Sequence, residues 1–241
     1  LDIDKYSKET RRRIGIVPQE LNIDPFFTPN ELLELQAGLY GIKKKNRKTE
    51  ELLSKVGLLD QRNAYARTLS GGMRRRLLIA KALVHDPEII ILDEPTAGLD
   101  PQARRDAWNL IRKLKGQGKT ILLTTHYMEE AQELSDRILI IIDGKIVADG
   151  SPNKLIEEFG GKKLIILRNC KESLLKNHSF EYEIDVEGEA HIPFDSNEHL
   201  FKILDIFTDI PDIEIEIKKP DLNEVFLNLT GKQITAEGLV K

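Results

Sequence analysis

Short apolar runs alternate with longer segments of helical spacing over about the first 150 residues of the chain. The apolar runs predict buried strands, each bounded by polar or turn-forming residues. These runs lie at 14–19, where Pro18 ends the strand, and at 88–92, 120–124 and 137–142. Buried strands that alternate with helices indicate an α/β fold in which a parallel sheet is covered on both faces.

The segment from about 28 to 84 predicts a helical subdomain between the first two strands. Thr28 followed by Pro29 is typical of a helix start, with Thr28 as the N-cap. Apolar residues at helical spacing predict two further helices, around 52–58 and 77–84.

The later strands are separated by shorter helical segments, which we expect at 103–114 and 129–134. After the strand at 137–142, Asp143-Gly144 predicts a hairpin turn into a strand over 145–148. The alternation that indicates a parallel sheet therefore ends in an antiparallel hairpin.

Beyond Gly160-Gly161 the regular alternation stops, and strand and helix patterns are mixed. Strands are predicted at 164–167, 181–186 and 213–217, and helices at 200–207 and 222–229. We therefore expect one domain over 1–160 and a small α+β accessory domain over 161–241.

Composition excludes several classes of protein. The 36 basic and 40 acidic residues give a net charge of −4, so we expect no nucleic-acid partner. The longest apolar runs are far shorter than the ~20 residues of a membrane-spanning helix. Cys170 is the only cysteine, which excludes an internal disulfide or a cysteine zinc site. Short basic runs such as Arg74-Arg75-Arg76 are expected to face solvent.

Two adjacent carboxylates, Asp93 and Glu94, directly follow the apolar run at 89–92. The carboxyl ends of strands in parallel sheets are where such folds bind ligands. In a phosphate site, Asp93 would hold Mg²⁺ through water and Glu94 would polarise an attacking water. Gln19 and His126 also follow predicted strands, so we expect both beside Asp93.

A second candidate for phosphate binding is Ser70-Gly71-Gly72, which precedes a predicted helix. Backbone amides of glycine and serine at a helix N-terminus form a concave anion site, although such caps are also common without a ligand. Gly98-Leu99-Asp100 follows the two carboxylates closely.

Together and in this order, these segments resemble the nucleotide-binding subunit of an ABC transporter, over roughly residues 10–150. The matching motifs are the Q-loop at Gln19, the signature at 69–73, Walker B at 89–94, the D-loop at 98–100 and the H-loop at His126. Met73 stands where many members have glutamine. With Arg74-Arg75-Arg76 and the segment 220–227, this resembles the exporter branch that serves drug, antibiotic or polysaccharide efflux.

The resemblance implies a P-loop NTPase core that hydrolyses ATP with Mg²⁺. It implies Glu94 as the general base, Asp93 as the Mg²⁺ partner and His126 as a contact of the γ-phosphate. Gln19 would touch both the Mg²⁺ and the attacking water. The remaining nucleotide-binding residues would be Ser70, Gly71, Gly72 and Asp100.

The resemblance also implies partners. Two copies of the chain, or this chain and another ATPase subunit, would pair head-to-tail with ATP between them. The loop after Gln19 and the helices of 28–84 would receive transmembrane permease subunits. The chain would then lie at the cytoplasmic face of the plasma membrane and power export.

A P-loop, G-x-x-x-x-G-K-[ST], is missing from the 241 residues. The nearest segment, Gly116 to Thr120, has Lys113 where the first glycine should stand, and it lies between a helix and a strand. In the family, Walker A precedes the Q-loop. Because the chain starts at Leu1, we expect a fragment truncated before the Q-loop; the alternative is a degenerate chain.

Two other functions remain open. A soluble ABC-type ATPase acting on nucleic acid or ribosomes would carry two cassettes or long insertions. Only about 50 residues separate Gln19 from Ser70, and they contain no heptad repeat. This short spacing disfavours a soluble ATPase of that kind. A non-catalytic regulatory cassette is the other alternative, and the presence of Asp93, Glu94 and His126 weighs against it.

The chain of residues 1–241 should neither bind ATP tightly nor hydrolyse it, because the principal phosphate clamp is absent. Phosphate release by the purified chain tests this. Vanadate-sensitive release that disappears in Glu94→Gln would contradict the prediction.

Overall fold

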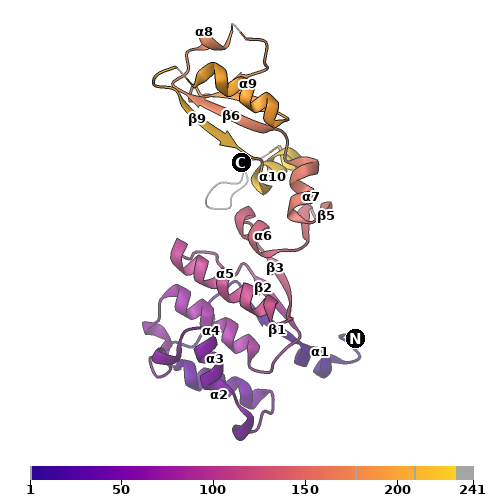
Figure 1. The fold of residues 1–241 in the computed structure, drawn as a ribbon. Helices are drawn as coiled ribbons and strands as arrows, with labels where there is room; N and C mark the ends of the chain where they lie inside the picture. Colours follow the sequence, from indigo (N-terminus) through magenta and orange to yellow (C-terminus); the bar gives the residue numbers. More distant parts are fainter. Residues whose placement is uncertain (1, 177, 209, 232–241) are drawn as a thin grey trace. The chain divides into compact units, whose positions relative to one another are not determined.

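The computed structural model describes residues 2–176, 178–208 and 210–231. The chain divides into two compact units, the first ending at Leu134 and the second starting at Ser135. Figure 1 shows the succession of helices and strands in each unit. Among the described residues, none of the helices combines the length and the apolar character needed to span a membrane.

The first unit contains a parallel sheet of three strands, β1 (Ile14–Val17), β2 (Ile89–Asp93) and β3 (Thr120–Thr124), in the order β1-β2-β3. Ile91 of β2 is in register with Ile16 and with Leu122 on the neighbouring strands. The predicted α/β architecture with a parallel sheet is therefore confirmed. The three carboxyl ends lie along one edge of this sheet.

Helices cover only one face of this sheet within the described residues of the first unit. Val17, Ile90 and Leu92 are buried, whereas Ile16 and Leu122 are 62% and 56% exposed. The expectation of helices on both faces is therefore wrong for this unit. The three strands lie side by side in the same order as in the sequence. Right-handed crossover connections between them therefore place all connecting helices on the same face of the sheet.

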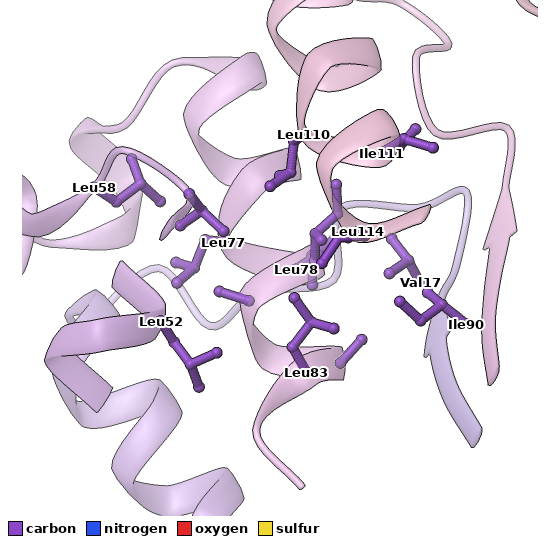
Figure 2. Packing of buried hydrophobic residues seen from close by; sticks show 14 of the residues in the cluster. Val17, Leu52, Leu58, Leu77, Leu78, Leu83, Ile90, Leu110, Ile111 and Leu114 are labelled. Atoms are coloured by element: carbon purple, nitrogen blue, oxygen red, sulfur yellow. The ribbon is translucent and has the colours of Figure 1, made fainter. Parts of the chain in front are cut away.

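The helices of the first unit are α1 (Ser7–Arg13), α2 (Pro29–Leu39), α3 (Thr49–Lys55), α4 (Gly71–Leu83), α5 (Pro101–Gly116) and α6 (Met128–Leu134), with 3₁₀ turns at Lys44–Asn46, Leu59–Gln61 and Ala66–Thr68. Helices α2 to α6 contribute residues to one continuous hydrophobic core, whereas α1 has no buried residue. Figure 2 shows leucines of α4 and α5 gathered beside Val17 and Ile90. This core fixes α4 and α5 against the sheet.

Local signals explain where these helices begin. Thr28 and Glu31 form a reciprocal capping box at α2, as the Thr28-Pro29 pair predicts. Helix α4 begins at Gly71, six residues before the apolar run that predicted it, because the Ser70 hydroxyl caps its first turn. Helix α1 had no counterpart in the sequence prediction.

The expected strand at 137–142 does not join the parallel sheet. Strand β4 (Ile138–Ile142) pairs antiparallel with β5 (Lys145–Gly150) through the predicted turn. Asp143 and Gly144 both have positive φ, 49° and 74°, as a two-residue hairpin of this type requires. The hairpin prediction is confirmed, although β5 extends to Gly150.

The second unit is an α+β arrangement that contains an antiparallel sheet in the order β7-β8-β6-β9. Strand β6 (Lys163–Arg168) lies between β8 and β9 in this sheet. The other strands are β7 (Glu183–Ile184), β8 (Ala190–Phe194) and β9 (Glu214–Lys218); the helices are α7 (Pro152–Phe159), α8 (Glu172–Leu175), α9 (Asn197–Phe207) and α10 (Leu222–Thr230). Strand β8 was not predicted.

The two compact units are divided between residues 134 and 135, not between 160 and 161, where the sequence predicts a domain boundary. Helix α7 packs against both β5 and α10, so the hairpin belongs to the second compact unit. The domain bounds expected from the sequence, 1–160 and 161–241, stay a prediction.

Glycine at position 72 is required by the close packing of α4 against α5. A Cβ added there would lie 2.8 Å from the Cβ of Ala103, whereas one added at Gly71 would lie 3.9 Å from its nearest neighbour. Gly72→Ala should therefore lower the free energy of unfolding by about 1–3 kcal/mol. Gly71→Ala should change it by no more than about 0.5 kcal/mol.

Urea unfolding followed by fluorescence of Trp108, the only tryptophan, measures both variants within the first unit. Equal stabilities for Gly71→Ala and Gly72→Ala would contradict this packing.

Candidate functional site

Three predicted site residues meet at the carboxyl edge of the parallel sheet, each just beyond a different strand. The Gln19 amide donates from Nε2 to Oε2 of Glu94 at 2.9 Å. On the other side, His126 Nδ1 lies 3.2 Å from Oε1 of Glu94. Both carboxylate oxygens of Glu94 are therefore engaged, and the side chain is 25% exposed.

The backbone of Glu94 is held in an uncommon conformation. Its φ is +44°, in the left-handed region that non-glycine residues seldom occupy. The Glu94 N–H donates to the Thr124 carbonyl at 3.0 Å, and the Ala97 N–H donates to the Glu94 carbonyl at 3.2 Å. These bonds turn the chain sharply after β2 and direct Glu94 toward the neighbouring strand ends.

Asp93 lies at the same edge and is exposed. The hydroxyl of Thr124, at the end of β3, donates to its Oδ1 at 2.5 Å. The structure thus places Asp93 next to Glu94 and orients it through β3. This carboxylate could take part in binding a hard cation, which prefers oxygen ligands.

Arg75 of α4 connects the segments that carry Gln19 and Glu94. Its Nη1 donates to the Pro18 carbonyl at 2.6 Å, and its Nη2 to the carbonyls of Gln19 at 2.8 Å and Glu94 at 3.0 Å. Arg75 is only 1% exposed, so the expectation that the run Arg74-Arg75-Arg76 faces solvent is wrong for this residue.

The positive charge of Arg75 is sustained by its surroundings. Burial lowers the pKa of its guanidinium, and the carboxylates of Glu130, Asp93 and Glu94 raise it. Because an arginine keeps its charge at neutral pH, the buried cation needs these acceptors and nearby negative charges. Arg75 therefore gives the carboxyl edge of the sheet both its shape and part of its electrostatics.

The Ser70-Gly71-Gly72 segment lies beside the start of α5. Ser70 Oγ accepts from the Met73 N–H at 3.2 Å, and Gly72 abuts Ala103. Asp100 caps α5, its Oδ1 accepting from the N–H groups of Gln102 at 3.0 Å and Ala103 at 2.9 Å. These residues form a second group, at the starts of α4 and α5.

Aromatic and cationic side chains support His126. The His126 and Tyr127 rings lie 4.2 Å apart and are tilted, and the Arg104 guanidinium of α5 lies 4.5 Å from the Tyr127 ring. Such cation–π contacts stabilise the position of the ring. The segment that carries His126 is therefore tied to α5.

Sequence reasoning missed three buried polar residues around this edge: Arg75, Thr96 and Glu130. A signal existed for Arg75, because Leu78 and Ile79 lie three and four residues later, on the same helix face, and are buried. Thr96 and Glu130 carry no local signal, since their contacts are made between distant segments.

The segment from Gly116 to Thr120 is not a phosphate loop. Gly116 ends α5, Gly118 has a φ of +83°, and Thr120 begins β3. The order is helix, turn, strand, the reverse of what a P-loop requires. Rejection of this segment from the sequence is confirmed.

Comparisons with known proteins agree with this geometry. Residues 2–97 match the family described as ABC transporter. The "Nod factor export ATP-binding protein I" of Burkholderia lata is 38% identical over 237 residues, covering 96% of this chain and 77% of that protein. The protein of the same name from Rhizobium etli is 37% identical over 238 residues, covering 96% of this chain and 74% of that protein.

A solved structure shares the fold. It is titled "Structure of ATP binding subunit of ABC transporter" and superposes with a TM-score of 0.56 at 25% identity. The match covers 73% of this chain and 72% of that one.

Removing the Arg75 guanidinium should strongly destabilise the first unit. Arg75→Met leaves three backbone carbonyls without their charged donor, and we expect a loss of about 3–5 kcal/mol in the free energy of unfolding. The neighbouring Arg76 donates to one carbonyl, that of Val56, at 3.2 Å, so Arg76→Met should lose only about 0.5–1.5 kcal/mol.

Urea unfolding monitored through Trp108 compares the two variants. If Arg75→Met proved no less stable than Arg76→Met, the buried guanidinium would not be the link between the two segments.

Proposed function

Because the chain belongs to the ABC transporter family, as an ATP-binding subunit of the export type, we propose that it hydrolyses ATP to drive export. The proposal rests above all on one observation, the meeting of Gln19 and His126 on the two carboxylate oxygens of Glu94. A carboxylate held between an amide and an imidazole at a strand end is suited to handle a water and a phosphate.

Glu94 is the proposed general base. It would accept a proton from the water that attacks the γ-phosphate, and a quarter of its side chain remains accessible for this. His126, which lies beside Oε1 of Glu94, would contact the γ-phosphate. Gln19, on Oε2, would orient the same water with its amide.

Asp93 and Gln19 are the proposed Mg²⁺ partners. Gln19 uses its Nε2 toward Glu94, so its amide oxygen is the atom suited to a cation. Asp93 is exposed and supplies a carboxylate, and this all-oxygen set fits Mg²⁺. When bound, the ion supplies positive charge that stabilises the phosphate oxygens.

Ser70, Gly71, Gly72 and Asp100 are proposed to contact ATP held by the opposite ATPase subunit. Ser70 caps α4, and the amides of a helix N-terminus favour anionic groups. Gly72 packs closely against Ala103, and this packing holds the start of α4 beside the segment that contains Asp100. The partner in this arrangement is a second copy or a paired subunit.

A complete site also needs a phosphate cradle of the P-loop type, which the 241 residues do not contain. We therefore propose hydrolysis for the assembled transporter, where other residues supply this cradle. The isolated chain contributes the carboxylates and the Ser70-Gly71-Gly72 segment.

We propose transmembrane permease subunits as the partners, with the chain at the cytoplasmic face of the membrane. The helices of 28–84 and the loop after Gln19 would receive them. The relatives from Burkholderia lata and Rhizobium etli are named for export of Nod factor. For this chain we propose export, with the compound selected by the permease.

Glu94→Gln should reduce ATP hydrolysis by the assembled transporter about 10²–10⁴-fold, because the amide cannot accept the proton of the attacking water. Glu88→Gln is the matched control. Glu88 lies just before the opposite end of β2 and is paired only loosely with Arg13, at 3.8 Å.

Steady-state phosphate release measures both variants. Hydrolysis by Glu94→Gln at the rate of Glu88→Gln would refute the assignment of Glu94 as the base.

A further inference from the structure

Four polar or charged residues are buried among the described residues: Thr49, Arg75, Thr96 and Glu130. Three of them surround the segment of Glu94. Glu130 of α6 is 0% exposed, and its Oε1 accepts two hydrogen bonds, from the Thr96 hydroxyl at 2.8 Å and from the Trp108 indole at 2.9 Å.

These bonds join separate parts of the chain at one oxygen atom. Thr96 lies two residues after Glu94, inside the turn where the Ala97 N–H reaches the Glu94 carbonyl. Trp108 lies in α5. Glu130 lies in the first turn of α6, four residues after His126. One oxygen therefore ties the turn that carries Glu94 to the segment that carries His126.

Packing alone does not account for an acidic residue here. A buried carboxylate is costly to desolvate, and an apolar side chain of similar volume would pack at lower cost. Oε2 of Glu130 is buried without a hydrogen-bond partner among the described residues. What offsets the charge is the pair of donors on Oε1 and the nearby guanidinium of Arg75.

We propose that Glu130 is a positioning residue for ATP hydrolysis, an inference that rests on the proposed function. By holding Thr96 and Trp108, it fixes the Glu94 turn against the start of α6 and so sets the approach of Glu94 to His126. Glu130 itself touches neither water nor phosphate. Since Ser70, Gly71, Gly72 and Asp100, which are proposed to contact ATP, belong to a separate group of residues, loss of Glu130 acts on the rate of hydrolysis more than on ATP affinity.

The experiment measures kcat and KM for ATP in the transporter purified with its transmembrane subunits. Thr96→Val removes one donor to Glu130 at nearly constant volume, and Trp108→Phe removes the other. Because small displacements of catalytic groups are costly, each should lower kcat about tenfold or more. KM should stay within about twofold. Thr96→Ser keeps the hydroxyl and should restore kcat.

Ile111→Val is the control for lost stability. Ile111 is buried on the same helix as Trp108 and takes no part in the network, so its variant should lower Tm yet keep kcat. In the isolated chain, Trp108 is the only tryptophan, and an unchanged emission maximum in Thr96→Val shows that the Trp108 environment persists.

The outcomes separate the two claims. If Thr96→Val and Trp108→Phe lose no more kcat than Ile111→Val, or if Thr96→Ser fails to restore it, the positioning role is overturned. If the wild-type transporter releases no phosphate, or Glu94→Gln leaves release unchanged, the proposed function fails instead.

Discussion

The buried guanidinium of Arg75 is the contact on which the geometry of the candidate site depends. Strands β1 and β2 are hydrogen-bonded along their length, but the chain leaves the sheet after Val17 and after Asp93. Beyond those points, Arg75 binds the carbonyls of Pro18, Gln19 and Glu94 with one planar, charged group. A fork of several fixed N–H donors suits this task, which a lysine ammonium would perform less specifically.

This contact also connects the two groups of site residues. Arg75 lies one turn into α4, the helix that Ser70 caps and that packs through Gly72 against α5. Movement of α4 relative to the sheet would therefore reach the Gln19 and Glu94 backbones directly. Glu130 acts from the other side, through Thr96 and Trp108. The Glu94 turn is thus restrained by buried charges of both signs.

Much of the site could be predicted from sequence, because its residues directly follow strands. Gln19, Asp93, Glu94 and His126 each come after an apolar run, and parallel strands bring such positions to one edge. Their chemical roles stay predictions. The α/β class, the hairpin at Asp143-Gly144 and the rejection of Gly116 to Thr120 as a phosphate loop were also predictable, since local turn and strand chemistry decides them.

The features that the sequence did not predict also have physical causes. Arg75 stands between two other arginines in the sequence, but on the helix it shares the buried face of Leu78 and Ile79. One face of the parallel sheet is not covered by helices because of the strand order β1-β2-β3. The spacing of apolar residues along the sequence does not reveal this order. Glu130, Thr96 and Trp108 meet only in the folded chain, where the cost of burying a carboxylate is offset by donors from distant segments.

A double-mutant cycle between Gln19 and Glu94 tests the central claim most directly, namely that Arg75 holds these two residues together. The free energy of unfolding is measured for Gln19→Ala, Glu94→Ala and the double variant, first with Arg75 and then with Arg75→Met. We expect a coupling of about 0.5–1.5 kcal/mol with Arg75 present, falling to near zero without it. An equal coupling in both backgrounds would contradict the account.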